Sequence, residues 1–162
     1  MPLIPFSLLP DDARVWVFGS SGPIDATAEA QLLAEVDGWL AEWKAHGAPL
    51  TCGRDWREGR FLVVGVDERG VGASGCSIDA LYHVLHALQR TLGTTFLAGG
   101  RVFYRAAGGD VVATDRATFA TLPLGDDTPV FDTAAVTAGA YRAGFERPLA
   151  SAWHRELRPR DR

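Results

Sequence analysis

The chain has 162 residues, of which 47% are hydrophobic and 22% are charged. These values are ordinary for a globular protein, and the length favours one domain with at most a small extension. The net charge of −4 argues against non-specific binding to nucleic acid, and no stretch approaches the ~20 apolar residues that a membrane helix needs. We therefore expect neither a nucleic acid nor a membrane as partner.

The two ends of the sequence are polar or proline-rich. The first six residues carry no basic segment and no continuous apolar run, so we expect no signal peptide and a cytoplasmic location. The cysteines Cys52 and Cys76 would then be reduced. Arginine and acidic residues alternate at the other end, which predicts a solvated, frayed terminus.

The first expected elements are an arm and a strand. Residues 1–12 are punctuated by proline, and we expect them to lie extended on the body, anchored by Phe6, Leu8 and Leu9. Residues 13–19 are rich in β-branched and aromatic side chains, which predicts a strand.

A helix is expected next, over about residues 27–45, with Asp25 or Thr27 as its cap. Its apolar residues recur at helical spacing and form one stripe. The stripe comprises Leu32, Leu33, Val36, Leu40 and Trp43. Strands are expected at 50–56 and 60–68, and the second is nearly all apolar, so it belongs in the middle of a sheet.

The strongest helical pattern covers residues 77–92, where Gly93 marks the end. Segments 101–106 and 111–114 flank a glycine-rich turn and predict a hairpin. Weaker patterns predict a helix at 116–122, a strand at 129–131, a helix at 134–144 and a tail anchored by Trp153.

Up to residue 106 the order strand, helix, strand, strand, helix, strand is that of the ferredoxin-like, split βαβ folds. We therefore expect an α+β protein: an antiparallel-rich sheet with two helices on one face, plus a small C-terminal α/β extension. The expected division is a core of residues 1–106, including the arm, and an extension of residues 107–162 packed on that core rather than independent.

The segment between the apolar strand and the best helix is rich in glycine. The spacing here is that of a phosphate-binding P-loop: Gly70 is followed by four residues and then by Gly75, Cys76 and Ser77. Cys76, however, stands where the motif has its lysine. The only lysine, Lys44, is expected on the first helix. Without the cation that reaches the terminal phosphates, ATP hydrolysis is not expected.

A dinucleotide fingerprint also fits the glycines alone. Gly70, Gly72 and Gly75 spell G-x-G-x-x-G. The region about 20 residues further on, at 94–97, has no acidic residue to hold a ribose. We therefore expect no nucleotide cofactor, and no other cofactor is indicated.

Cys76 begins the helix, where the helix dipole favours a thiolate. Asp79, His83 and His86 follow along one helix face, but ~15 Å of helix separates Cys76 from His86, so no metal site is expected. A catalytic pair would need a histidine from elsewhere, such as His46 or His154. A structural thiol is the preferred interpretation.

Several blocks along the chain resemble a family of small bacterial proteins of uncharacterised function. These blocks are residues 5–6, 13–16, 43–47, 60–61, 72–79, 128–132 and 151–154, and Gly-Cys-Ser-Ile-Asp at 75–79 is the most specific. Members are often described as ABC transporter ATPases, but this loop lacks its lysine and the chain has no LSGGQ-like signature. The resemblance implies kinship and brings no catalytic residues.

The last third is also similar, loosely, to GYF-type modules that bind proline-rich peptides. The similarity rests on the aromatic residues at 103–104, 119, 131 and 153, without the Gly-Tyr-Phe core.

The leading hypothesis is a binding protein that uses the start of the second helix. Its expected ligand-binding residues are Gly72, Ser74, Gly75, Cys76, Ser77 and Asp79. The expected partner is a protein or a small anionic ligand, because helix N-termini favour anions. The alternative is a thiol-dependent enzyme with Cys76 as its nucleophile.

Overall fold

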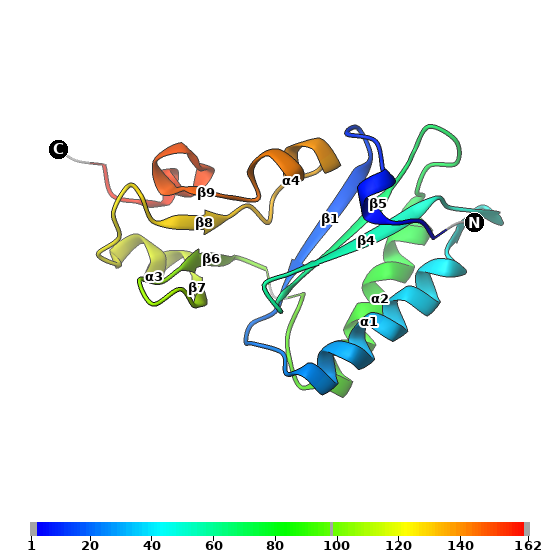
Figure 1. Ribbon diagram of the computed structural model, residues 1–162, viewed down its shortest axis with the longest axis horizontal. Coiled ribbons are helices and arrows are strands. Elements are labelled where there is room, and N and C mark those ends of the chain that lie inside the picture. The colour runs from blue at the N-terminus through cyan, green and yellow to red at the C-terminus, as the bar shows by residue number, and fades with distance from the viewer. Residues whose placement is uncertain (1–2, 98, 161–162) are drawn as a thin grey trace.

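The structure is a computed structural model that describes residues 3–97 and 99–160. The chain forms three layers: two long helices, a three-stranded sheet and a four-stranded sheet with short helices at its margins (Figure 1). This is the α+β class, with antiparallel sheets, that the sequence predicts.

The middle layer is the sheet of β1 (Arg14–Gly19), β5 (Phe61–Val66) and β4 (Cys52–Arg57), in the order β1-β5-β4, with antiparallel pairing throughout. All six residues of β5 are buried, which confirms its expected central position. A tight turn at Glu58 and Gly59, both at positive φ, joins β4 to β5.

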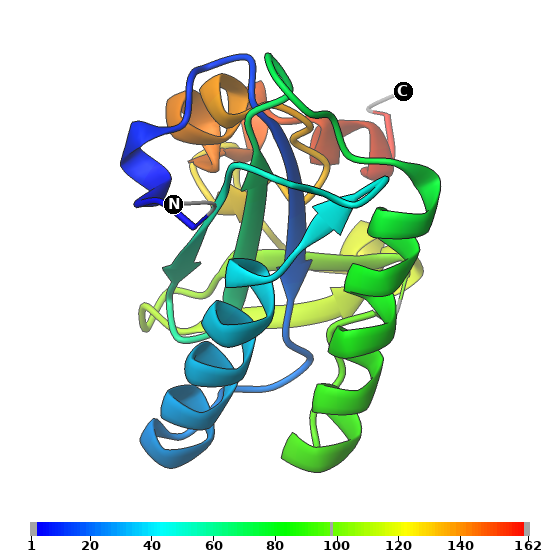
Figure 2. The ribbon, with the colours of Figure 1, turned by 90° about the vertical axis from the view of Figure 1, so that its right-hand side faces the viewer.

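Helices α1 (Ala26–Ala41) and α2 (Gly75–Leu92) lie side by side and cover one face of this sheet (Figure 2). Asp25 caps α1 by accepting a hydrogen bond from Ala28 N at 2.8 Å, and Gly93 ends α2 in the left-handed conformation. The buried residues of the two helices pack on four residues of the sheet. The helix residues are Leu32, Val36, Leu40, Leu81, Leu85 and Leu88, and the sheet residues are Phe18, Leu62, Val64 and Val66.

The first helix ends earlier than the sequence pattern predicts. After Ala41 the chain turns into a small hairpin of β2 (Lys44–Ala45) and β3 (Ala48–Pro49), so Lys44 lies on a strand and not on the helix. Trp43 is buried, and its Nε1 donates to Ser77 O at 2.9 Å. This long-range contact directs the chain toward α2, which a local apolar pattern does not reveal.

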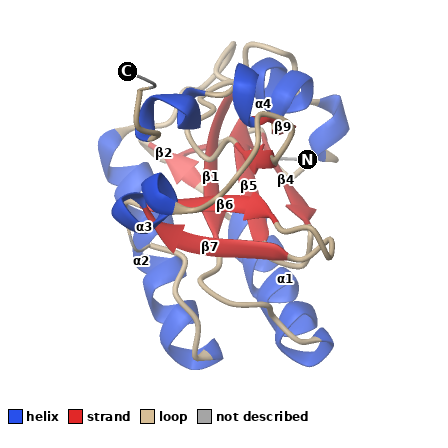
Figure 3. Ribbon diagram, turned by 90° about the vertical axis from the view of Figure 1, so that its left-hand side faces the viewer, coloured by secondary structure: helices blue, strands red, loops and turns tan. Residues whose placement is uncertain are grey.

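The third layer is a sheet in the order β7-β6-β8-β9, also antiparallel. Its elements are β6 (Arg101–Arg105), β7 (Val111–Asp115), α3 (Arg116–Thr121), β8 (Pro129–Phe131), α4 (Ala138–Gly144) and β9 (Glu146–Pro148). Its long strands run across those of the first sheet (Figure 3). The hairpin, α3 and β8 confirm the sequence, whereas β9 was not expected and α4 begins four residues later than the expected start at 134.

The ferredoxin-like topology is wrong. In that fold the strand after the second helix would pair within the first sheet, but β6 pairs with β7 and β8. The physical reason is that the first sheet is apolar on both faces: Val15, Phe61 and Val63 point away from the helices and need cover of their own. The second sheet supplies it, giving three layers where the sequence analysis expected two.

The N-terminal arm packs on the face of β4 and β5 that is turned away from the helices. Its short 3-10 helix, Phe6–Leu8, buries Phe6, and Leu9 is buried next to it, whereas the expected anchor Leu8 is 68% exposed. The arm fits because Gly53 and Gly65 lack side chains: a Cβ at Gly65 would lie 2.6 Å from Leu9 Cδ1.

Polar contacts also hold the arm. Ile4 N donates to Cys52 O at 2.8 Å, extending the edge of β4. From α4, the Arg142 guanidinium donates to the carbonyls of Phe6 (2.9 Å) and Leu9 (2.8 Å).

The C-terminal segment is packed rather than frayed through Arg158. A 3-10 helix, Trp153–Leu157, lies against α3, and Arg158 Nη1 donates to Phe119 O at 2.7 Å. Trp153 anchors the segment as expected, with Nε1 donating to Asp132 Oδ1 at 3.0 Å. Among the helices of the described residues, none combines the length and the apolar character needed to cross a bilayer.

Candidate functional site

The predicted site residues form the loop after β5 and the first turn of α2. Ser74 is the helix N-cap and exchanges hydrogen bonds with Ser77: Ser77 N donates to Ser74 Oγ at 3.1 Å, and Ser74 N donates to Ser77 Oγ at 2.7 Å. This capping box explains why the helix starts at Gly75. Both hydroxyls therefore serve the helix, and Ser77 is buried.

A carboxylate of the chain itself lies over the loop. Glu68 Oε2 accepts a hydrogen bond from Ala73 N at 3.1 Å. A Cβ at Gly72 would lie 2.8 Å from the same oxygen, so the carboxylate occupies the space beside this glycine. Above Gly75, in contrast, an added Cβ would meet no atom within 4 Å. The loop is thus filled at Gly72 and open at Gly75.

The sequence analysis missed Glu68 and Trp43 as partners of this segment. Glu68 holds the loop from one side, and Trp43 Nε1 holds the first helical turn through Ser77 O at 2.9 Å. An acidic residue shortly before a glycine-rich turn was the available signal for Glu68. No sequence signal connects Trp43 with a residue 34 positions later.

The two cysteines differ sharply. Cys52 is buried, its Sγ lies 3.4 Å from Leu40 O, and burial raises the pKa of its thiol to about 12. Cys76 is exposed in the first turn of α2. Position alone therefore makes Cys76 the accessible thiol and Cys52 a packing residue, as expected for Cys52.

The acidic and imidazole groups on α2 do not gather around Cys76. Asp79 Oδ2 and His83 Nε2 are 3.8 Å apart and exposed, and His86 Nδ1 is hydrogen-bonded to Gln89 at 2.9 Å. Within residues 3–97 and 99–160, no three metal-ligating side chains of the His, Cys, Asp or Glu type come together.

The remaining histidines lie in different surroundings. His46 is exposed at the tip of the β2–β3 hairpin, at φ 50°. His154 is fully buried against Phe119 and stacked on Trp153 at a ring distance of 3.9 Å. Burial disfavours the charged ring and lowers the pKa of His154 to about 4. His154 is thus a core residue of the third layer.

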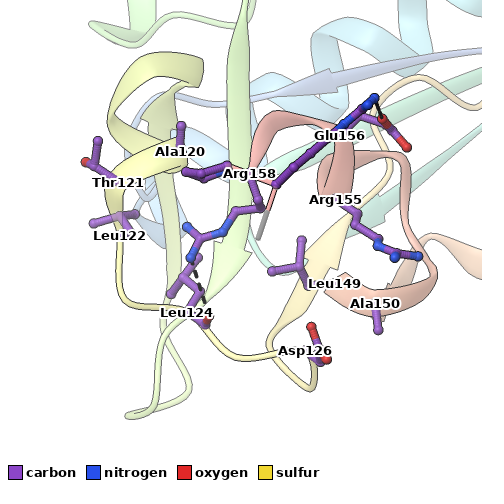
Figure 4. Close-up of a pocket in the computed structure, with 12 residues that line it drawn as sticks. Ala120, Thr121, Leu122, Leu124, Asp126, Leu149, Ala150, Arg155, Glu156 and Arg158 are labelled. Carbon is purple, nitrogen blue, oxygen red and sulfur yellow. Dashed lines mark hydrogen bonds and ion pairs between the residues drawn. The ribbon is translucent and has the colours of Figure 1, made fainter. Parts of the chain in front are cut away.

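A cavity of about 1130 Å³ lies at the C-terminal end of the molecule, bounded by α3 and the last 3-10 helices (Figure 4). Arg158 crosses it toward Leu124, to whose carbonyl its Nη2 donates at 3.4 Å. None of the predicted ligand residues lines it. The aromatic residues that resemble a GYF module are also not displayed there, since Phe103, Phe119 and Phe131 are buried.

No family model, no curated protein and no solved structure matches this chain. Kinship with the family of small bacterial proteins therefore stays a prediction.

Proposed function

We propose that the protein is a binding protein whose contact surface is the segment 70–79, and that its partner there is another protein. The observation that carries this proposal is that the segment is exposed while side chains of the same chain bind its backbone. Val71, Gly75, Cys76 and Asp79 are exposed, while Glu68 and the Ser74–Ser77 capping box form hydrogen bonds with the backbone amides. Exposed loops that a scaffold positions are a common form of recognition site.

The charges of the segment favour a protein over a small anion. Glu68 already accepts the Ala73 amide, and Asp79 adds a second negative charge one turn into the helix. An incoming phosphate or carboxylate would be repelled by both groups. A protein surface with basic or amide donors is compatible with them, and Val71 supplies an apolar contact.

A photo-crosslinking amino acid tests this surface directly. Placed at Cys76 in the cells that express the protein, it is expected to give one discrete crosslinked species. At Ala87, which is exposed on the same helix, it should give none. The species should disappear when Asp79→Arg is added, and its persistence in that variant, or equal crosslinking from both positions, would contradict the proposal.

A second candidate function is thiol-dependent catalysis with Cys76 as nucleophile. Its support is the exposure of the Cys76 thiol in the first turn of α2. The rate of alkylation by iodoacetamide, followed from pH 5 to pH 9 in a Cys52→Ala variant, distinguishes the two functions. An apparent pKa below 7 supports the enzyme, whereas the value of a free thiol, ~8.5, removes this candidate and leaves the binding surface.

A further inference from the structure

A second cavity, separate from the segment 70–79, lies where all three layers meet. Its volume is about 210 Å³, below the ~300–1,000 Å³ typical of sites for drug-sized ligands. Residues from β1, α2, β6 and the loops beside them form its walls. They include Gly19, Tyr82, Phe96, Gly100, Arg101 and Thr133.

The positive charge of Arg101 at this cavity is not neutralised by the chain. Its only hydrogen bond among the described residues runs from Nη1 to Thr95 O at 3.4 Å, and it forms no ion pair with any described carboxylate. Arg105, four residues later on the same strand, shows the contrast, because it pairs with both Glu58 (2.8 Å) and Glu146 (2.7 Å).

A second arginine adds to the positive potential from behind. Arg60 is buried, and its guanidinium donates to the carbonyls of Ser20 (3.1 Å), Ser21 (3.0 Å) and Val111. Its Nε is buried without a hydrogen-bond partner in the described part of the chain. Burial and the charge of Arg101 lower the pKa of Arg60. Among the described residues, these two cations are thus compensated by carbonyl dipoles and by the Phe103 ring, whose centroid lies 6.0 Å from the Arg60 guanidinium, and by no carboxylate.

The two arginines are connected through one loop contact. Ser21 N donates to Thr95 O at 2.9 Å, and Arg101 Nη1 donates to the same oxygen at 3.4 Å. Ser21 O is in turn one of the carbonyls to which Arg60 donates.

Aromatic residues also border the cavity. Phe96 and Phe103 are buried, and Tyr82 is 40% exposed, with its ring 5.5 Å edge-on from Phe18. The Phe103 ring packs against Gly19, where an added Cβ would collide with it. The cavity therefore combines a cation that has no ion-pair partner among the described residues with one accessible aromatic ring, that of Tyr82.

We propose that this cavity binds a small carboxylate no larger than a single ring. Arg101 pairs with the carboxylate, since a planar guanidinium matches its two oxygens. The rest of the ligand lies against the exposed part of the Tyr82 ring. Glu68 and Asp79, which disfavour anions at the segment 70–79, do not line this cavity, so the two sites are independent.

Titration of the ¹⁵N-labelled protein with sodium benzoate, at constant ionic strength, tests the proposal. Amide shifts are expected at Tyr82, Gly100, Arg101 and Thr133 and not at residues 70–79. Benzamide, which has the same shape without the charge, should bind at least tenfold more weakly. Equal binding of the two compounds, absence of saturable benzoate binding, or shifts confined to 70–79 would overturn the proposal. Tighter binding of phenyl phosphate would overturn the carboxylate assignment.

Charge variants locate the contact. Arg101→Gln should weaken benzoate binding at least tenfold, Arg101→Lys should weaken it less, and Arg90→Gln, which removes an exposed cation elsewhere on α2, should leave it unchanged. Unchanged binding in Arg101→Gln, or an equal loss in Arg90→Gln, contradicts the assignment. If Arg101→Gln does not fold, Arg101→Lys and the benzamide comparison still decide the outcome.

Discussion

The two faces of the β1-β5-β4 sheet are covered in different ways. Toward the helices the contacts are mainly aliphatic, with leucines and valines from α1 and α2 on Leu62 and Val64. Toward the second sheet they are aromatic: the ring of Phe61 lies 4.9 Å from Phe103, 5.0 Å from Phe131 and 5.0 Å from Phe145. Neighbouring residues of one strand thus belong to two cores of different chemistry.

The edges of the two interfaces differ as well. On the helix side one ion pair, Arg54–Asp37 at 2.8 Å, bridges the layers. On the other side Arg105 joins Glu58 of the first sheet to Glu146 of the second. The difference suggests that the helix layer depends on apolar periodicity, whereas the second sheet is positioned by specific aromatic and charged contacts.

The largest expected effect comes from removing the aromatic centre. Phe61→Ala should lower the free energy of unfolding by ~4 kcal/mol, since it deletes three ring contacts and leaves a cavity. Leu62→Ala, at the adjacent buried position facing the helices, is the control, with an expected loss of ~3 kcal/mol. Urea unfolding measures both, and a loss below ~1 kcal/mol for Phe61→Ala would mean that the aromatic core contributes little.

Acid should weaken the third layer through His154. The unfolded histidine takes up a proton near pH 6.5, whereas the folded one, with its pKa lowered to about 4, does not. Below pH 6.5 the neutral folded histidine therefore lowers the free energy of unfolding. This loss grows at ~1.4 kcal/mol per pH unit and reaches ~3 kcal/mol as the pH falls toward 4.

The variant His154→Phe isolates this effect. It should lose less stability than the wild type between pH 7 and pH 4, whereas His86→Gln, at an exposed position, should follow the wild type. Parallel pH curves for wild type and His154→Phe would show that His154 does not remain neutral in the folded protein.

A smaller effect is expected at the charged edge. Arg105→Ala removes hydrogen bonds to Glu58 and Glu146 and should cost ~2 kcal/mol in chemical unfolding. Arg54→Ala on the helix side should cost no more than ~1 kcal/mol, as is usual for a partly exposed single pair. Equal losses would remove the contrast between the two edges.

The smallest expected effect is at a single hydroxyl. Tyr141 donates to Asp55 Oδ2 at 2.7 Å across the interface between the sheets, and burial together with this bond raises the pKa of the phenol. Tyr141→Phe should cost ~1 kcal/mol, and Tyr82→Phe, at a 40% exposed ring, almost nothing. Thermal melts resolve the two variants, and a neutral Tyr141→Phe would indicate that packing alone positions α4.

The sequence predicted the elements whose pattern is local. The strands at β1, β4 and β5, the helix α2 with Gly93 at its end, and the β6–β7 hairpin all follow from periodicity and turn residues. What it did not predict depends on contacts between distant residues. Trp43 and Ser77 end the first helix early, and β6 leaves the first sheet to cover its second apolar face, where Phe103 packs on Phe61.

For the candidate segment, the sequence analysis expected a glycine-rich turn followed by a helix from residue 77. The helix begins earlier, at Gly75, because Ser74 caps it. The role of Glu68 and the unpaired charge of Arg101 depend on which side chains approach from other elements, and a sequence pattern does not contain that information.

Gly53 and Gly65 are paired across β4 and β5 and leave a notch in the sheet. The arm around Phe6 packs into it, at the strand that would otherwise present a free edge. Free edges recruit strands from other molecules, so the arm acts as an internal competitor against such recruitment. Loss of the arm, or a side chain at either glycine, should therefore cause self-association before it causes unfolding.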